Sequence, residues 1–194
     1  MRFEMFEFKS VTSTNDIAIN LIKDEKREIG CVYANDQTQG RGTQGKQWIS
    51  NKGNFFGSIF FPLKDNYPPF NEFSTISPIL ISSVIKHFCK KQKINLKFPN
   101  DVFVNGKKIC GILQELITSH NRKFLIIGIG VNIVSNPNIK SKYQATNILI
   151  ETKKKPEIKE ILDLIISSYE KFFFDLNTYN YEHFKEKADL MALN

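Results

Sequence analysis

The fold is decided by one hairpin, Val102-Phe103-Val104-Asn105-Gly106-Lys107-Lys108-Ile109-Cys110-Gly111-Ile112-Leu113. The Asn-Gly pair tolerates the positive φ angles of a two-residue hairpin turn, and apolar residues flank it on both sides. The pattern predicts a strand over 102–104 and a second strand over 107–116. The apolar segment 122–131, which follows a turn at Ser119–Asn121, predicts a third strand that pairs back. An antiparallel sheet therefore forms the centre of the protein.

Alternation along the second strand predicts that Lys108 shares a face with Cys110 and Ile112. The latter two favour the core, so a lysine on the same face requires an anionic partner or an exit at the sheet edge. Alternatively, Lys108 extends to solvent from the start of its strand. Gly111 would let a ligand or another backbone come close.

Apolar spacing predicts helices at 15–23, 71–91, 156–174 and 181–189, and short apolar runs predict strands at 31–35, 54–61 and 96–98. Ser13 or Thr14 is the expected N-cap of the first helix. The order indicates an α+β fold, a mixed β-sheet with helices packed beside it. No repeat or long linker divides the chain, so we expect 1–194 to form a single domain.

The composition is that of a globular protein: 194 residues, 41% hydrophobic and 24% charged. The apolar run 55–63 falls short of the roughly 20 residues that span a bilayer, so no membrane association is expected. Residues 1–9 alternate Phe with charge and do not form a signal peptide. Three cysteines without CxxC spacing indicate a reduced, cytoplasmic protein, with Cys110 in the core. Three scattered histidines argue against a histidine-based metal site.

The net charge of +7 has two explanations. It reflects either a lysine-rich surface or an anionic partner, namely a nucleic acid, a nucleotide or an acidic protein. The densest lysine runs, 90–93 and 153–155, lack the interleaved aromatic side chains on which bases stack. Nucleic-acid binding is therefore not expected.

The segment Gly40-Arg41-Gly42-Thr43-Gln44-Gly45-Lys46-Gln47-Trp48 is the first chemical motif. Its three glycines let backbone N–H groups approach an anion, and Arg41 and Lys46 add positive charge. It matches neither a Walker loop nor a dinucleotide-binding turn. The alternative is a surface loop whose glycines serve turns.

Three further motifs are weaker. Lys97-Phe98-Pro99-Asn100-Asp101 offers short polar groups after a proline, although it also fits an ordinary turn. Gly128-Ile129-Gly130-Val131-Asn132 places glycines inside an apolar strand, where they serve a bulge or a close approach. Ser13-Thr14-Asn15 fits a helix start and leaves polar groups over for a ligand.

Taken in order, the motifs resemble the catalytic domain of biotin protein ligases, the biotin–[acetyl-CoA-carboxylase] ligases. The matching pieces are Ser13-Thr14-Asn15, Asp36-Gln37 before the 40–48 motif, the 97–101 motif, Gly106–Leu113 and the 128–132 motif, with Ala145-Thr146-Asn147 as a further signature. The resemblance extends from about residue 8 to about residue 190. It implies the class II aminoacyl-tRNA-synthetase-like fold of biotin and lipoate ligases.

The resemblance also implies the chemistry. Biotin and ATP with Mg²⁺ would be the substrates, and biotinyl-5′-AMP would be transferred to a lysine of the biotin carboxyl carrier protein. Lys108 and Arg41 would be catalytic, and Asp101 would be linked to Mg²⁺. The biotin-binding residues would be Ser13, Thr14, Asn15, Gln37, Gly40, Arg41, Gly42, Thr43, Lys108, Gly111, Gly128 and Gly130. The ATP-binding residues would be Arg41, Lys46, Trp48, Asn100, Lys108 and Asn132, with Trp48 equally suited to anchor a core.

The chain departs from the family pattern in three respects. Many members carry GRGRRGR, whereas Thr43, Gln44 and Lys46 stand here, so we expect the adenylate to leak. Phe98 replaces a common tryptophan. We also expect neither an N-terminal helix-turn-helix nor a C-terminal SH3-like domain. An exposed edge strand would permit a homodimer.

Three other functions stay open. A lipoate ligase or octanoyltransferase shares the fold but lacks the paired 40–48 and 97–101 motifs. A basic nucleic-acid-binding protein would show a steep salt dependence and no ATP–pyrophosphate exchange. A biotin-binding relic would bind biotin without activating it.

Overall fold

The computed structural model describes residues 1–137 and 143–193. A seven-stranded sheet runs through the molecule in the order β1-β2-β3-β7-β6-β5-β4. The strands are β1 (Glu4–Phe8), β2 (Gly30–Ala34), β3 (Phe55–Pro62), β4 (Ile94–Lys97), β5 (Asp101–Val104), β6 (Lys107–Ser119) and β7 (Arg122–Val131). Only β1 and β2 pair in parallel among these strands, so the sheet is mixed. The α+β prediction is correct.

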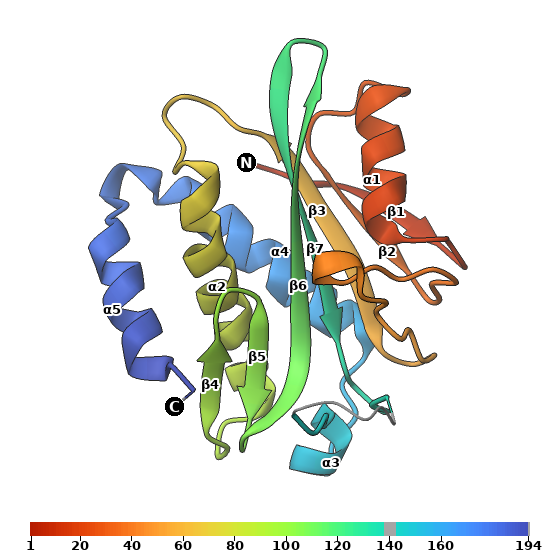
Figure 1. The fold of residues 1–194 in the computed structure, drawn as a ribbon, viewed down its shortest axis with the longest axis vertical. Helices are drawn as coiled ribbons and strands as arrows, with labels where there is room; N and C mark the ends of the chain where they lie inside the picture. Colours follow the sequence, from red (N-terminus) through yellow and green to blue (C-terminus); the bar gives the residue numbers. More distant parts are fainter. Residues whose placement is uncertain (138–142, 194) are drawn as a thin grey trace.

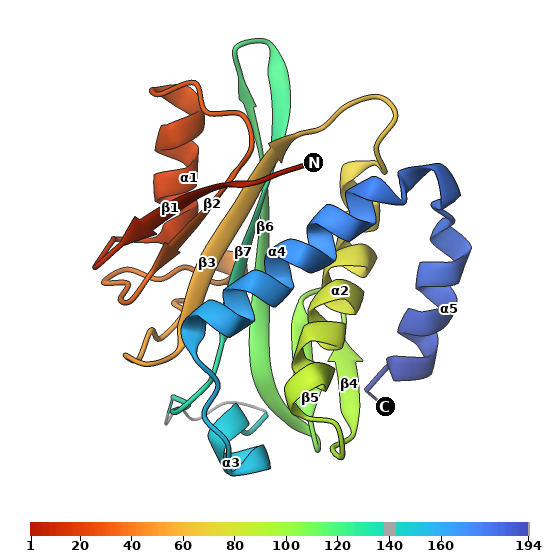
Figure 2. The same cartoon turned by 180° about the vertical axis from the view of Figure 1, so that it is seen from behind.

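The helices lie on both faces of this sheet. They are α1 (Thr14–Lys23), α2 (Phe73–Phe88), α3 (Ile148–Thr152), α4 (Ile158–Phe174) and α5 (Tyr181–Met191). Figure 1 shows α1 on the near face, where the segment that follows β2 also crosses the sheet. Figure 2 shows α4 and α2 across the opposite face, with α5 beside α2. One face is therefore covered by long helices, and the other is only partly covered.

Two apolar clusters reflect this division. The larger joins α2 and α4 to the sheet and includes the buried residues Phe61, Phe73 and Tyr169. The smaller lies under α1 and joins Leu21 and Ile22 to Phe60 and its neighbours. The rest of the α1 face carries glycine and polar side chains, and this is where a ligand pocket has room. No helix among the described residues is long and apolar enough to cross a membrane.

The central hairpin has the predicted geometry. Asn105 and Gly106 have φ angles of 50° and 76°, so both turn residues are in the left-handed region. The strand Arg122–Val131 has the bounds that the sequence predicts. Among the described strands and α-helices, the prediction misses β1 and the short helix α3.

Candidate active site

A pocket of about 420 Å³ opens on the α1 face of the sheet. Its floor comes from β6 and β7, and its walls come from the start of α1, the loop 40–48 and the segment after β4. Every predicted site residue except Gly40 lines it: Ser13, Thr14, Asn15, Gln37, Arg41, Gly42, Thr43, Lys46, Trp48, Asn100, Asp101, Lys108, Gly111, Gly128, Gly130 and Asn132. The structure brings these residues together, and their roles toward a ligand stay predictions.

Gly40 lies behind the pocket wall. A Cβ atom there would come within 2.6 Å of the Trp48 carbonyl oxygen, and the Trp48 amide donates a hydrogen bond of 2.9 Å to the Gly40 carbonyl oxygen. Gly40 is therefore needed for the close crossing of the two ends of the loop.

Glycines make the floor flat, and the Trp48 ring lies on it. A Cβ atom at Gly111 or Gly130 would come within 2.6 Å or 2.5 Å of the indole. At Gly128 a Cβ atom would collide with the Asn15 side chain. The indole nitrogen of Trp48 is buried and has no hydrogen-bond partner among the described residues. Glycine at these positions thus serves the close approach of Trp48 and Asn15.

Lys108 stands at one end of the floor because of a β-bulge. Val102 pairs with Cys110 and Phe103 pairs with Lys108, which leaves Ile109 as the extra residue of β6. Ile109, Cys110 and Ile112 face the large core, whereas Lys108 and Gly111 line the pocket. The prediction that Lys108 shares a face with Cys110 and Ile112 is wrong, since the bulge shifts the alternation by one residue.

The expected anionic partner of Lys108 is present. Its Nζ lies 2.6 Å from Oδ1 of Asp101, whose side chain is 15% exposed. The same Nζ lies 5.4 Å from the centre of the Trp48 ring, a cation–π distance. An ammonium has three donors, so the pair with Asp101 leaves two for a ligand.

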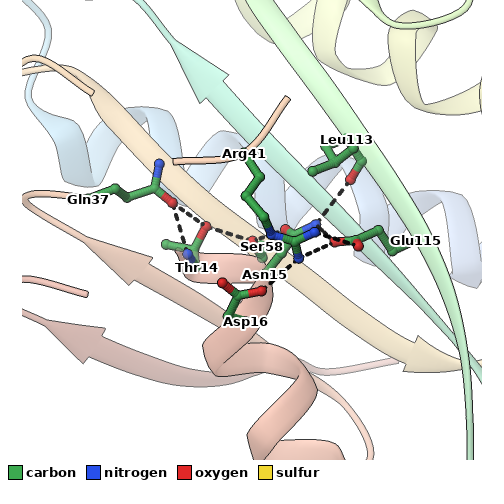
Figure 3. Close-up of polar contacts among 8 residues, drawn as sticks. All are labelled: Thr14, Asn15, Asp16, Gln37, Arg41, Ser58, Leu113 and Glu115. Carbon is green, nitrogen blue, oxygen red and sulfur yellow. Dashed lines mark hydrogen bonds and ion pairs between the residues drawn. The ribbon is translucent and has the colours of Figure 1, made fainter. Parts of the chain in front are cut away.

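At the opposite end of the pocket, the lining residue Arg41 belongs to an acidic cluster whose carboxylates, Asp16 and Glu115, lie beside the lining (Figure 3). The guanidinium donates two hydrogen bonds to Glu115, of 2.8 and 2.7 Å, and its Nη2 lies 2.7 Å from Asp16. The hydrogen bonds with Glu115 raise the pKa of Arg41 above its ordinary value. Two carboxylates against one guanidinium leave this end with a net negative charge.

Polar side chains from three elements continue from this cluster (Figure 3). Asn15 donates to Oε2 of Glu115 at 2.7 Å, and its carbonyl oxygen contacts the Ser58 hydroxyl. Ser58 in turn lies 2.7 Å from the Thr14 hydroxyl, and the Thr14 backbone N–H donates to Oε1 of Gln37 at 2.8 Å. Asn15 therefore joins the start of α1 to both the sheet and the cluster.

Ser13 is the N-cap residue of α1 by position, but its side chain makes no capping hydrogen bond. The prediction that Ser13 or Thr14 is the N-cap residue is confirmed at Ser13. The Gln37 side chain, rather than that of Ser13, accepts a hydrogen bond from the first helical N–H, that of Thr14. The Ser13 hydroxyl, in a residue that is 2% exposed, lies on the pocket wall.

Asn132 lies beyond the end of β7 with one free acceptor. Its Nδ2 donates to the Thr146 carbonyl oxygen at 3.0 Å, whereas its buried Oδ1 has no partner among the described residues. Asn54 supports the segment that follows, because its Oδ1 accepts the N–H groups of Ile133, Val134 and Ser135 at 2.9, 3.1 and 3.3 Å. A donor group of a ligand would satisfy the Asn132 acceptor.

A sequence model of the Biotin/lipoate A/B protein ligase family matches residues 7–132, which include the pocket floor, the loop and the start of α1. The chain belongs to this family.

Relatives within the Biotin/lipoate A/B protein ligase family are similar along most of the chain. The "Bifunctional ligase/repressor BirA" of Bacillus subtilis is 28% identical over 189 residues, 94% of this chain and 58% of that protein. The "Biotin--[acetyl-CoA-carboxylase] ligase" of Paracoccus denitrificans is 27% identical over 156 residues, 77% of this chain and 65% of that protein. The chain thus spans about 60% of the length of these relatives.

Solved structures of family members have the same fold. The biotin protein ligase of Leishmania major, in complex with biotinyl-5-AMP, has a TM-score of 0.81 at 25% identity, over 98% of this chain and 81% of that one. The enzyme of Aquifex aeolicus, in complex with biotin and ATP, has a TM-score of 0.82 at 25% identity, over 98% of this chain and 78% of that one.

The predicted link between Asp101 and Mg²⁺ can be compared with the ligands available. Asp101 is paired with Lys108, and the residues that the structure describes contain no group of three or more His, Cys, Asp or Glu side chains that could hold a metal ion. Among the described residues that line the pocket, Asp101 is the one carboxylate, and its link to Mg²⁺ stays a prediction.

Sequence reasoning about the family motifs missed three residues that organise the pocket. Glu115 was hidden by the same bulge, because it shares a face with Lys108 only after the one-residue shift. Asp16 directly follows the Ser13-Thr14-Asn15 motif, and Ser58 is a buried hydroxyl in the middle of an apolar strand. Two signals in the sequence could have revealed this part of the pocket: the isolated hydroxyl of Ser58 and the charge of Glu115.

Proposed function

We propose that this chain is the catalytic domain of an ATP-dependent biotin protein ligase. It would activate biotin as biotinyl-5′-AMP and transfer the biotinyl group to a lysine of the biotin carboxyl carrier protein of acetyl-CoA carboxylase. The proposal rests on the membership of the family and on relatives whose structures hold biotin, ATP or biotinyl-5-AMP.

The observation that carries the proposal is the charge distribution of a single pocket. Lys108 and Lys97 outnumber Asp101 at one end, whereas at the other end the lining residue Arg41 is paired with both Asp16 and Glu115, which lie beside the lining. A flat glycine floor connects the two ends. Biotin has an anionic carboxylate at one end and a neutral ureido ring with two N–H donors at the other. It therefore matches this pocket in one orientation.

In the first half-reaction, a carboxylate oxygen of biotin would attack the α-phosphorus of MgATP. A carboxylate–phosphorus bond forms, the bond from the α-phosphorus to its bridging oxygen breaks, and pyrophosphate leaves. Both reactants are anionic, so a cation between them lowers the barrier. The two donors that Lys108 does not use on Asp101 could serve one oxygen of each.

In the second half-reaction, the ε-amine of the acceptor lysine would attack the carbonyl carbon of the mixed anhydride. An amide bond forms, AMP leaves, and the amine loses a proton. The loop 40–48 with Trp48 covers the floor and would limit the access of water to the anhydride. The Ser13 and Thr14 hydroxyls and Gln37 are the proposed partners of the ureido ring, and Asn100 and Asn132 those of ATP.

Several sequence predictions remain predictions within this proposal. They are the carrier-protein acceptor, the cytoplasmic location, the homodimer, the single-domain organisation and the contact of Arg41 with the carboxylate or phosphate. The last of these competes with the orientation given above, because Glu115 and Asp16 pair with the Arg41 guanidinium at the end of the pocket assigned to the ureido ring.

Biotin-dependent ATP–pyrophosphate exchange tests the proposal. The wild-type chain should catalyse exchange, and Lys108→Ala should lower its rate about 100-fold or more, the cost of losing one group that stabilises transition-state charge. Lys107→Ala, the matched control, changes a neighbouring lysine outside the pocket lining. Exchange by Lys108→Ala at the wild-type rate, or none by the wild type, would contradict the proposal.

A lipoate or octanoate ligase or transferase is the second candidate, since the family description includes lipoate ligases. Incubation with ATP and either biotin or lipoate, followed by mass measurement of the carrier protein, separates the two. A mass increase with biotin alone supports the first proposal.

A further inference from the structure

We propose that Glu115 is a positioning residue that anchors the loop 40–48 to the sheet and thereby sets the affinity of the pocket for the neutral head of its ligand. The proposal rests on the proposed function for the identity of that ligand, biotin. Its structural part, the anchoring of the loop, does not depend on it.

The loop has few other polar attachments. Most of its hydrogen bonds are internal, such as Gly42 N–H to the Lys46 carbonyl oxygen at 2.7 Å. Between Gly40 and Gln47, the described residues make two polar side-chain contacts with the rest of the protein. One is the Arg41 cluster, and the other is a long hydrogen bond of 3.5 Å between Asn100 and Thr43. Arg41 is thus the main polar anchor of this glycine-rich segment.

Glu115 fixes the direction of that anchor. Two parallel N–H···O bonds hold the planar guanidinium in one orientation, which a single contact would not do. Asp16 adds a third contact to the same guanidinium, but through one nitrogen only. The Glu115 side chain is 25% exposed and the Asp16 side chain 41%, so the pair with Glu115 is the less screened of the two.

Glu115 also orients the start of α1. Its Oε2 accepts both from Arg41 and from Nδ2 of Asn15, each at 2.7 Å. The Ser58 hydroxyl donates to the side-chain Oδ1 of Asn15, so both the oxygen and the nitrogen of this side-chain amide have partners within the protein. Asn15 is packed against Gly128 as well. One carboxylate therefore connects the loop, the helix start and the sheet at the end of the pocket that carries Thr14 and Gln37.

Removal of the charge at Glu115 should loosen the attachment of the loop through Arg41 and that of the start of α1 through Asn15. In Glu115→Gln one bond to Arg41 is lost and the other is no longer charge-assisted, while side-chain size is kept. We expect the dissociation constant of biotin to rise about tenfold, equivalent to the loss of one good hydrogen bond. Because Lys108 at the other end is untouched, the exchange rate at saturating biotin should stay within about threefold. The effect would appear in KM for biotin rather than in kcat.

The matched control is Glu28→Gln, which removes a carboxylate that pairs with an arginine elsewhere on the surface. Glu28 lies 3.0 Å from Arg122 and does not line the pocket. This variant should bind biotin like the wild type. In the double variant Arg41→Ala with Glu115→Gln, the loss should be smaller than the sum of the two single losses, because Glu115 acts in part through Arg41.

A second measurement needs no ligand. Limited digestion with trypsin, analysed by mass spectrometry, reports cleavage after the exposed Lys46 of the loop. Glu115→Gln should be cut there several times faster than the wild type or Glu28→Gln. Unchanged cleavage overturns the anchoring, as does an unchanged or tighter biotin affinity. If neither the wild type nor Glu115→Gln binds biotin but Glu115→Gln is cleaved faster, the proposed function fails while the anchoring is supported.

Discussion

The Trp48 indole lies directly on Gly130, so closely that a Cβ atom on Gly130 would come 2.5 Å from Cε2 of the ring. Gly130→Ala should therefore displace the indole from the pocket floor. The chain contains one tryptophan, so its fluorescence reports this position alone. We expect a shift of the emission spectrum and weaker binding of biotin in a fluorescence titration.

The control for this change is Gly106→Ala. Gly106 has a φ of 76° in the hairpin turn, and a Cβ atom added there would meet nothing within 4 Å, so alanine strains the turn without touching the pocket. Its melting temperature should fall while its tryptophan emission stays that of the wild type. If Gly130→Ala has an unchanged emission spectrum and biotin affinity, the close contact is refuted.

Asn54 should contribute strongly to stability. Its Oδ1 accepts three backbone N–H groups of the segment after β7, and its Nδ2 donates to the Ser135 carbonyl oxygen at 2.9 Å. Asn54→Ala leaves these groups without a partner, at a cost of about 3 kcal/mol in the free energy of unfolding. Urea denaturation measures it. Asn51→Ala, a nearby asparagine, should cost less than about 0.5 kcal/mol, and equal losses would contradict the assignment.

The loop should release part of its adenylate. Thr43 has no charge with which to hold a phosphate, and within the part of the chain that the structure describes its hydroxyl accepts one long hydrogen bond, of 3.5 Å, from the Asn100 amide. Without carrier protein, biotinyl-AMP should appear in solution, and Thr43→Arg should lower the amount released. Thr118→Arg adds the same charge at the exposed far end of β6 and should change nothing. Complete retention by the wild type would refute this prediction.

The three cysteines should be unreactive in the folded protein. All are buried, and burial raises the pKa of Cys31 to about 12 and that of Cys89 to about 11. Burial also raises the pKa of Cys110. A raised pKa leaves less thiolate at pH 8, and the thiolate is the nucleophile. Titration with a chromogenic disulfide at pH 8 should find no fast thiol before unfolding and three after it.

The sequence predicts those parts of the fold where local rules act alone. The Asn105-Gly106 turn and the strand Arg122–Val131 have the predicted positions, because turn chemistry and a continuous apolar run are local signals. The helix predicted at 71–91 covers Phe73–Phe88, because a 3₁₀ turn precedes it at Phe70–Glu72. Element ends depend on such neighbours and are less predictable.

The sequence predicts which residues line the pocket but not how those residues are arranged. Motif order brought Lys108, Trp48 and the glycines to one place, as the structure does. The pairing of Arg41 with Glu115 joins residues 74 positions apart, and no local pattern reveals it. The face of the sheet predicted for Lys108 is wrong, because the prediction assumes strict alternation along β6. The extra residue Ile109 interrupts that alternation.

That extra residue gives the length of β6 a meaning for the lysine that precedes it. Val102 pairs with Cys110 and Phe103 with Lys108, so deletion of Ile109 would leave both pairings in place and make Lys108 and Cys110 neighbours on opposite faces of a regular strand. The ammonium would stay on the substrate side, and the large core would lose one apolar side chain. In comparing related chains, a gap of one residue between Lys108 and Gly111 should therefore be read as a change in stability, whereas a gap of two would turn the lysine toward the interior.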